Sequence, residues 1–273
     1  MIGIIIEMLS YDFLVRALIV GTLVSICSSL LGVTLVLKRY SMIGDGLSHV
    51  GFGALAVASA FGLAPLAVAI PIVVLAAFLL LRISEDSSIK GDSAVALLST
   101  GSLAIGVLSV SLSKNANTDV LNYMFGSILA MNALDVKISI ILSIAVIILY
   151  IFLYNKVFVI TFDEAFSRAT GVRVNAYNML IAFLTAITIV IGMRLMGALL
   201  ISSLVIFPAL TSMRIFKRFK SVTISSVCIA VVCLLLGMAV SYVLEVPTGA
   251  SVVVINILAF LIFSIISLIK RGL

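Results

Sequence analysis

Two side chains of opposite chemistry, a carboxylate and an imidazole, stand four residues apart in an otherwise apolar chain. They are Asp45 and His49, and His49 is the only histidine among the 273 residues. Residues four apart share one face of an α-helix, so both side chains can point at the same place. Converging oxygen and nitrogen donors form half of a site for a divalent transition metal. A packing histidine bonded to a backbone carbonyl is the simpler alternative.

The composition places this pair in a membrane protein. Hydrophobic residues make up 63% of the chain and charged residues 10%, whereas about 25% of an ordinary soluble domain is charged. A soluble fold of this length could not bury so much apolar surface, so lipid must cover it. The net charge of +6 is divided among short clusters between apolar runs, which is typical of membrane loops. We therefore expect a single all-α transmembrane domain over residues 1–273, in contact with the lipid bilayer and with no nucleic acid.

Nine apolar stretches are long enough, or nearly so, to cross a bilayer, which takes about 20 helical residues. We expect spans at 12–37, 41–61, 64–82, 92–113, 133–154, 176–193, 195–213, 222–244 and 250–269. A shorter piece at 120–130 cannot cross and fits a re-entrant or interfacial segment. Eight spans plus such a segment is the alternative topology.

The distribution of Lys and Arg predicts the orientation of these spans. With the N-terminus outside and nine crossings, thirteen of the 17 Lys and Arg residues fall on the cytoplasmic side, where the C-terminus then also lies. Lys38 and Arg39 mark the inner interface, which puts Asp45 about 9 Å and His49 about 15 Å into the membrane. That depth is close to the midplane, where ionisable residues by default mark a substrate pathway. Glycines that let the helix unwind or pack closely flank the pair: Gly44, Gly46, Gly51 and Gly53.

A polar segment at 163–174 follows the fifth span on the expected cytoplasmic side. Asp163 and Glu164 begin a short helical pattern, where carboxylates favour the positive end of the helix dipole, and Gly171 is a natural stop. The apolar residues of this pattern fall on one face: Phe162, Ala165, Phe166 and Ala169. Such a helix either lies on the membrane surface or docks into a groove of a soluble partner. The pattern alone leaves both interpretations open.

A third segment, at 197–209, has two serines and a proline inside an apolar stretch. It is either a kinked packing helix whose hydroxyls bond backbone carbonyls, or part of a pore lining. The chain also lacks the glycine-rich phosphate-binding loop of nucleotide-binding proteins, so ATP cannot bind in that manner. We therefore expect that the chain is not itself an enzyme.

Three segments together resemble the ABC-3 family of membrane permeases, the bacterial zinc and manganese uptake transporters. They are 44–49, 163–172 and 197–209, they occur in the family's order, and the length and hydropathy match along essentially the whole chain. The resemblance implies an all-α ABC importer permease of the ABC-3, or vitamin B12-importer-like, type. The chain departs at Gly46, where relatives usually carry alanine or threonine, and we expect this glycine to loosen the helix beside the metal site.

The resemblance also implies partners and residue roles. It implies a permease homodimer in the bacterial plasma membrane, served by cytoplasmic ABC ATPase subunits and an extracytoplasmic metal-binding protein. Asp45 and His49 match the intramembrane metal pair, and 163–174 matches the coupling helix that inserts into the ATPase. The residues expected to make that contact are Asp163, Glu164, Ala165, Phe166, Arg168 and Gly171. ATP hydrolysis is expected in the partner, no cofactor is permanently bound, and the cargo is Zn²⁺, with Mn²⁺ next and iron also open.

Other functions stay open at this stage. A proton-coupled secondary carrier would need no ATPase but would require a titrating pair of carboxylates. A permease for cobalamin or iron–siderophore complexes would need a wide apolar cavity. A membrane scaffold without transport activity would leave the Asp45–His49 pair unexplained. Export is open as well, because the direction of transport follows only from the family.

Overall fold

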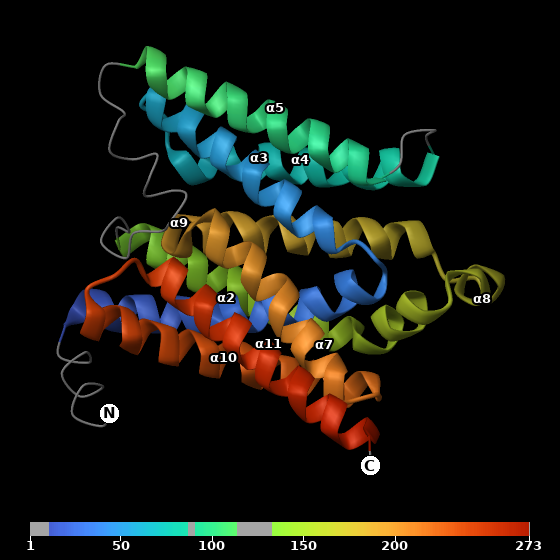
Figure 1. Cartoon of the computed structure of the whole chain (residues 1–273). Coiled ribbons are helices and arrows are strands. Elements are labelled where there is room, and N and C mark those ends of the chain that lie inside the picture. Colours follow the sequence, from blue (N-terminus) through green and yellow to red (C-terminus); the bar gives the residue numbers. More distant parts are fainter. Residues whose placement is uncertain (1–10, 87–90, 114–132, 273) are drawn as a thin grey trace.

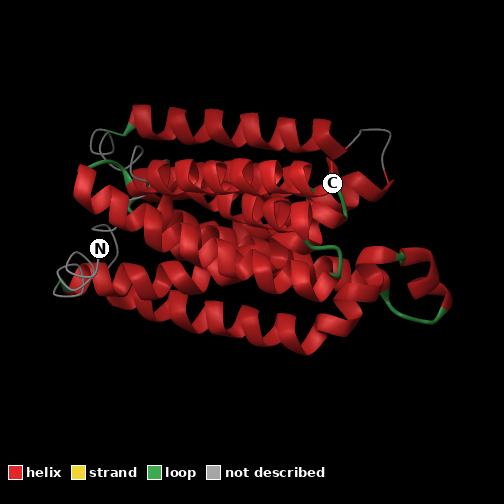
Figure 2. Cartoon of the chain, turned by 60° about the horizontal axis from the view of Figure 1, so that its bottom comes forward, coloured by secondary structure: helices red, strands yellow, loops and turns green. Residues whose placement is uncertain are grey.

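The computed structural model describes residues 11–86, 91–113 and 133–272, and every regular element in these ranges is an α-helix (Figure 1 and Figure 2). The helices are α2 (Asp12–Leu37), α3 (Ser41–Ala60), α4 (Pro65–Asp86), α5 (Gly91–Leu112), α7 (Ala133–Phe162), α8 (Glu164–Ala169), α9 (Val174–Ile215), α10 (Phe219–Leu244) and α11 (Thr248–Gly272). Eight helical segments of this described part are long and apolar enough to cross a membrane, with α9 supplying two. The predicted all-α transmembrane bundle is therefore confirmed.

The helices agree with the predicted spans, with shifts at some ends. The largest shift is in α7, whose 30 residues make it about 45 Å long. It therefore reaches well beyond a hydrocarbon core of about 30 Å and carries the chain out to α8. One predicted span, α3, is long enough but is not among the eight, because its glycines, Asp45 and His49 make it too polar. The predicted piece at 120–130 lies outside the described residues.

The long helix α9 is two helices that meet at a reversal. Gly197 has a φ of 81° and a ψ of 162°, a conformation that glycine adopts without a steric penalty. A Cβ atom on Gly192 would lie 2.4 Å from Cδ1 of Ile201. Nine residues of straight helix would separate these positions by about 13 Å, so the chain folds back on itself, as Figure 1 shows. The limbs, Val174–Arg194 and Met196–Ile215, confirm the predicted boundary between two spans.

The core is built around α2, which is buried without interruption from 27 to 35 and packs against α7, α9 and α10. Burial on all sides is typical of a central helix. Two of its hydroxyl groups are paired across helices, with Ser29 Oγ 2.7 Å from Ser226 Oγ and Thr34 Oγ1 3.3 Å from the Tyr150 hydroxyl. Such pairing removes the cost of an unsatisfied hydroxyl away from water.

A second layer of helices lies on the other side of α9. It consists of α3, α4 and α5, with α3 packed against both of the others and against α9 (Figure 1). This arrangement places the helix that carries Asp45 and His49 inside the bundle rather than at its rim. The two layers therefore meet at the limbs of α9.

The two ends of the bundle differ in charge. The chain enters α2 at one end and leaves α11 at the other, where α8 also lies (Figure 1). A chain that crosses a membrane an odd number of times must enter its first span and leave its last span on opposite sides, as α2 and α11 do here. The end with α8 holds Lys38, Arg39, Arg82, Lys156, Arg168, Arg173, Arg214, Lys217, Arg218, Lys220 and Lys270. The described basic residues near the opposite end are Arg16, Lys137 and Arg194.

Replacement of Gly32 by alanine tests the packing of α2 on α9. A Cβ atom there would lie 2.0 Å from the carbonyl oxygen of Val205, a backbone atom that cannot move aside. We expect Gly32→Ala to cost about 2 kcal/mol or more and to lower the melting temperature in detergent. Gly101→Ala is the matched control, because no heavy atom lies within 4 Å of its Cβ position. The control should be neutral or slightly stabilising. Equal melting temperatures for Gly32→Ala and wild type would contradict this packing.

Candidate metal site

The side chains of Asp45 and His49 converge on α3 as their spacing predicts. His49 Nε2 lies 3.7 Å from Asp45 Oδ2, which is too far for a hydrogen bond. Two donors at this separation fit around one ion, because metal bonds to nitrogen and oxygen are about 2.1 Å long. The side chains are 30% and 41% exposed for His49 and Asp45. The pair is therefore accessible even though α3 is packed inside the bundle.

The open face of α3 lies between its two packed faces. On one side, Ser48 Oγ is 3.0 Å from Ser202 Oγ of α9. On the other side, a Cβ atom on Gly46 would lie 2.6 Å from Val95 Cγ1 of α5. Asp45 and His49 lie between these directions on the helix. They therefore face the space between α5 and the second limb of α9.

The glycines beside the pair serve close packing. Positions Gly46 and Gly53 both face α5, and a Cβ atom on Gly53 would lie 2.4 Å from the backbone oxygen of Ser102. The helix is continuous from Ser41 to Ala60. The helix is therefore regular at Gly46, and this glycine lets α5 approach.

One copy of the chain provides few ligands. Among the described residues, no group of three or more His, Cys, Asp and Glu side chains could hold a metal ion. The hydroxyls next to the pair are engaged with the backbone, since Ser48 donates to the Asp45 carbonyl and Ser202 to the Ala198 carbonyl. This supports the packing interpretation of the 197–209 segment, although Ser202 also stands beside the helix of the pair. The Ser48–Ser202 contact joins residues 154 positions apart, so no local pattern could reveal it.

The helix α8 has the predicted beginning and end. Asp163 is its N-cap, and its Oδ1 accepts a hydrogen bond of 2.8 Å from the backbone N–H of Phe166. At the other end, Gly171 has a φ of 81°, the left-handed conformation that commonly closes a helix. On α8 itself the Phe166 side chain is 58% exposed, whereas Ser167 is buried. Phe162, the last residue of α7, is 59% exposed, but its ring centroid lies 5.1 Å from that of Phe158 and 5.9 Å from that of Phe219. Figure 2 shows α8 projecting beyond the end of the bundle.

A buried lysine ties α8 to two other helices. Lys38 follows the last residue of α2, and its side chain is only 6% exposed. Its Nζ lies 2.5 Å from Glu164 Oε1 of α8 and 2.6 Å from Asn178 Oδ1 of α9. Glu164 is among the residues expected at the partner contact, but its carboxylate turns back to the bundle. Since α3 begins at Ser41, this link ends three residues before the helix that carries the metal pair.

The charge of Lys38 controls the ionisation of Glu164. Partial burial acts to raise the pKa of Glu164, but the hydrogen bond and charge of Lys38, helped by Asn178 and Arg168, outweigh it. The pKa of Glu164 is therefore held below its ordinary value of 4.5. A carboxylate with a lowered pKa in the folded state stabilises the fold above its unfolded pKa, and this contribution is lost as the pH falls through the folded pKa.

The chain is similar along most of its length to one protein family and to membrane proteins of metal transport systems. The family model described as "ABC 3 transport family" matches residues 10–267. The chain is 29% identical to "Manganese import system permease protein ScaB" of Streptococcus gordonii over 252 residues, covering 92% of this chain and 90% of the relative. It is 30% identical to the "Probable iron transport system membrane protein" of Haemophilus influenzae over 263 residues, covering 96% and 93%.

A solved structure has the same fold along nearly its full length. It is "PsaBC from Streptococcus pneumoniae in complex with Fab", with a TM-score of 0.86 and 30% sequence identity. The match covers 96% of this chain and 95% of that chain. The described helices therefore follow the arrangement of a known membrane protein.

A double-mutant cycle on Lys38→Met and Glu164→Gln tests the buried link. We expect the two effects on unfolding free energy to be non-additive at neutral pH, with a coupling energy of about 1 kcal/mol. The coupling should disappear as the pH falls through the lowered pKa of Glu164, which lies below 4.5, because the carboxylate then becomes neutral. Asp163→Asn is the control, since it removes a neighbouring charge but keeps a good N-cap. Additive effects of the two substitutions at pH 7 would contradict the link.

Proposed function

The chain belongs to the ABC 3 transport family, and on this premise we propose that it is the membrane-spanning permease subunit of an ATP-binding-cassette importer for a divalent transition-metal ion. The observation that carries the proposal is the Asp45–His49 pair, two donors 3.7 Å apart and accessible on a packed helix. His49 is the ninth of the 20 residues of α3, so it lies close to the middle of the helix. The printed names of the manganese and iron relatives support the same class of cargo.

The complete metal site requires a second copy of the chain. One chain offers one carboxylate and one imidazole, whereas bound transition metals usually have four or more ligands. In our proposal two permeases meet so that their α3 helices present two oxygens and two nitrogens to one ion. Such a set suits tetrahedral zinc, and it suits manganese if water or backbone carbonyls complete the shell. A site with so few protein ligands binds modestly, as transport requires release of the ion.

The proposed cargo is manganese first and zinc second. Manganese is favoured by the name of the relative from Streptococcus gordonii, and iron by that of the relative from Haemophilus influenzae. Zinc, the ion expected from the sequence, is still favoured by the imidazole donor. Manganese, zinc and iron differ in the number of ligands that they require. The second copy of the chain and water would have to supply the ligands that one chain lacks.

The energy would come from ATPase subunits docked at the end that carries α8. In this proposal Phe166, exposed on α8, enters a groove on the ATPase, and Lys38 passes the movement of α8 to the start of α3. The many basic residues at this end support its assignment to the cytoplasm of a bacterium. The ion would then be delivered from the opposite side by a metal-binding protein.

A proton-driven carrier has less support. Such a carrier needs carboxylates that titrate along the path. Asp135, a buried carboxylate of α7, is held by Arg194 through contacts of 2.9 Å and 3.0 Å to its two oxygens. Both oxygens of this carboxylate are thus engaged by one guanidinium, in the bidentate geometry of a structural ion pair.

Metal accumulation in a deletion strain tests the site. We expect wild-type protein to restore cell-associated manganese, zinc or iron, and Asp45→Asn and His49→Gln to lose nearly all of that restoration, because each removes half of the donors. Asp92→Asn is the matched control, since this exposed carboxylate lies in the first turn of α5 and not on α3. Full restoration by either α3 variant at equal membrane abundance would refute the site. Unchanged levels of all three metals in the deletion strain would refute metal uptake.

Replacement of Phe166 by alanine tests docking. We expect Phe166→Ala to reduce co-purification of the ATPase subunits and transport-coupled ATP hydrolysis about tenfold or more, the loss typical of a buried aromatic anchor. The fold should be unchanged, because the side chain is exposed. Phe152→Ala is the control, because this residue is more exposed but lies within the membrane-spanning part of α7. Normal ATPase recovery with Phe166→Ala would contradict docking through α8.

A further inference from the structure

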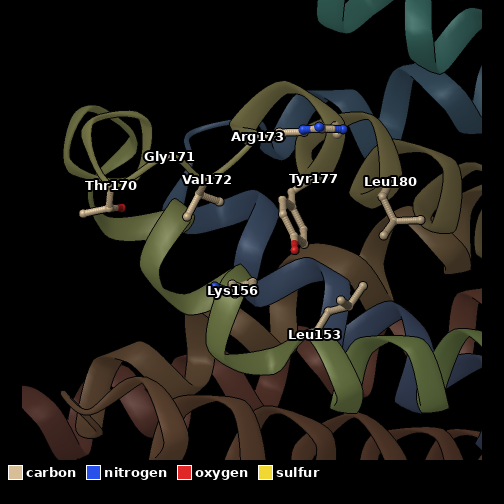
Figure 3. A pocket seen from close by; sticks show the side chains of 9 residues that line it. Leu153, Lys156, Thr170, Gly171, Val172, Arg173, Tyr177 and Leu180 are labelled. Atoms are coloured by element: carbon tan, nitrogen blue, oxygen red, sulfur yellow. The ribbon is translucent and has the colours of Figure 1, made fainter.

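A cavity of about 600 Å³ opens between α7 and the first limb of α9, next to the loop that leaves α8 (Figure 3). None of its lining residues belongs to α3, so it is separate from the metal pair. Its walls come from α7, from the loop at 170–172 and from the first turns of α9. The side chains that matter for its chemistry are Leu153, Lys156, Arg173, Tyr177 and Leu180.

The electrostatic character of the cavity is positive. Lys156 and Arg173 line it, and no carboxylate does. Within the described part of the chain, neither of these basic residues forms an ion pair, in contrast to Lys38 and Arg194. Arg173 is also the N-cap of α9 and has no side-chain cap, so the positive end of the helix dipole adds to the field. The cavity therefore favours an anionic group.

The walls change from charged to apolar in the direction of the membrane. Leu180 follows Arg173 by seven residues, which is about 10 Å along α9 toward the middle of the bilayer. The helix α7 runs in the opposite direction, toward the end of the bundle that carries α8. Leu153, three residues before Lys156, therefore lies about one turn further into the membrane. The apolar surface continues along both helices to Leu149 and Phe183, which are exposed. Figure 3 shows Tyr177 pointing into the space between the two helices.

We propose that this cavity binds an anionic phospholipid, with its headgroup at the basic rim that Lys156 and Arg173 contribute and an acyl chain along Leu153 and Leu180. A soluble anion would use the basic rim but would leave the apolar wall uncovered. Basic pockets between transmembrane helices on the cytoplasmic side are suited to such headgroups, and tyrosine is common at this level of the bilayer. Because the loop at 170–172 forms part of the wall, the bound lipid also stabilises the connection between α8 and α9.

A single tryptophan can report on this cavity, because the chain contains none. The full chain with Leu180→Trp is reconstituted in phosphatidylcholine bilayers that contain increasing fractions of brominated phosphatidylglycerol, and quenching gives the relative local affinity. The double variant Lys156→Gln/Arg173→Gln removes the basic rim. Lys270→Gln is the matched control, since this lysine lies at the same end but does not line the cavity. Leu153→Trp repeats the measurement from α7, so that a folding defect of one probe does not decide the result.

We expect phosphatidylglycerol to be preferred over phosphatidylcholine, and the double variant to reduce the preference about 25-fold, since each lost basic side chain contributes about fivefold. The Lys270→Gln control should keep the full preference. Equal quenching by both brominated lipids would overturn the proposal. Loss of the preference on addition of inorganic phosphate would also overturn it, because the cavity would then bind a soluble anion. The same applies if added ATPase subunits abolish quenching by the anionic lipid, since a protein would then fill the cavity. None of these readouts depends on metal transport.

Discussion

The free-energy cost of placing a carboxylate and an imidazole near the middle of a helix packed inside a membrane protein is the constraint on which the rest of the structure depends. Asp45 and His49 lower the hydropathy of α3 so far that it is not among the membrane-spanning candidates. The other helices shelter it, with α4, α5 and α9 packed around it. Small residues allow this packing, since Gly46 and Gly53 admit α5 and the Ser48–Ser202 contact joins α9. Only the face with the two donors is left open.

A second constraint connects this pair to the end of the bundle. Lys38 is buried and charged, a situation that is favourable only with a close acidic partner. Glu164 supplies that partner from α8, and Asn178 completes the contact from α9. The first residue of α3 follows Lys38 by three positions. A displacement of α8 by a bound partner therefore has a short physical route to the helix of the donors, through one ion pair and one tight turn.

The sequence predicted what depends on local patterns. Apolar runs located the spans, Asp163 and Gly171 located the ends of α8, and the four-residue spacing placed Asp45 beside His49. It missed what depends on contacts between distant residues, such as the pairing of Lys38 with Glu164 across 126 positions. The packing role of Gly46 was missed for the same reason, because its neighbour Val95 lies on another helix. The cavity beside α8 is likewise formed by two helices, α7 and α9, and neither sequence by itself indicates a cavity.

The most direct test of the central proposal is pulsed electron paramagnetic resonance of Mn²⁺ bound to the intact, nucleotide-free permease–ATPase complex. His49 is the only histidine in the chain, so an imidazole nitrogen coupled to manganese within the membrane subunit can come only from this residue. We predict a clear nitrogen modulation in the wild-type complex and its loss with His49→Gln. A modulation that is identical in the two proteins, or absent from a wild-type complex that transports manganese, would contradict the assignment of Asp45 and His49 as the metal site.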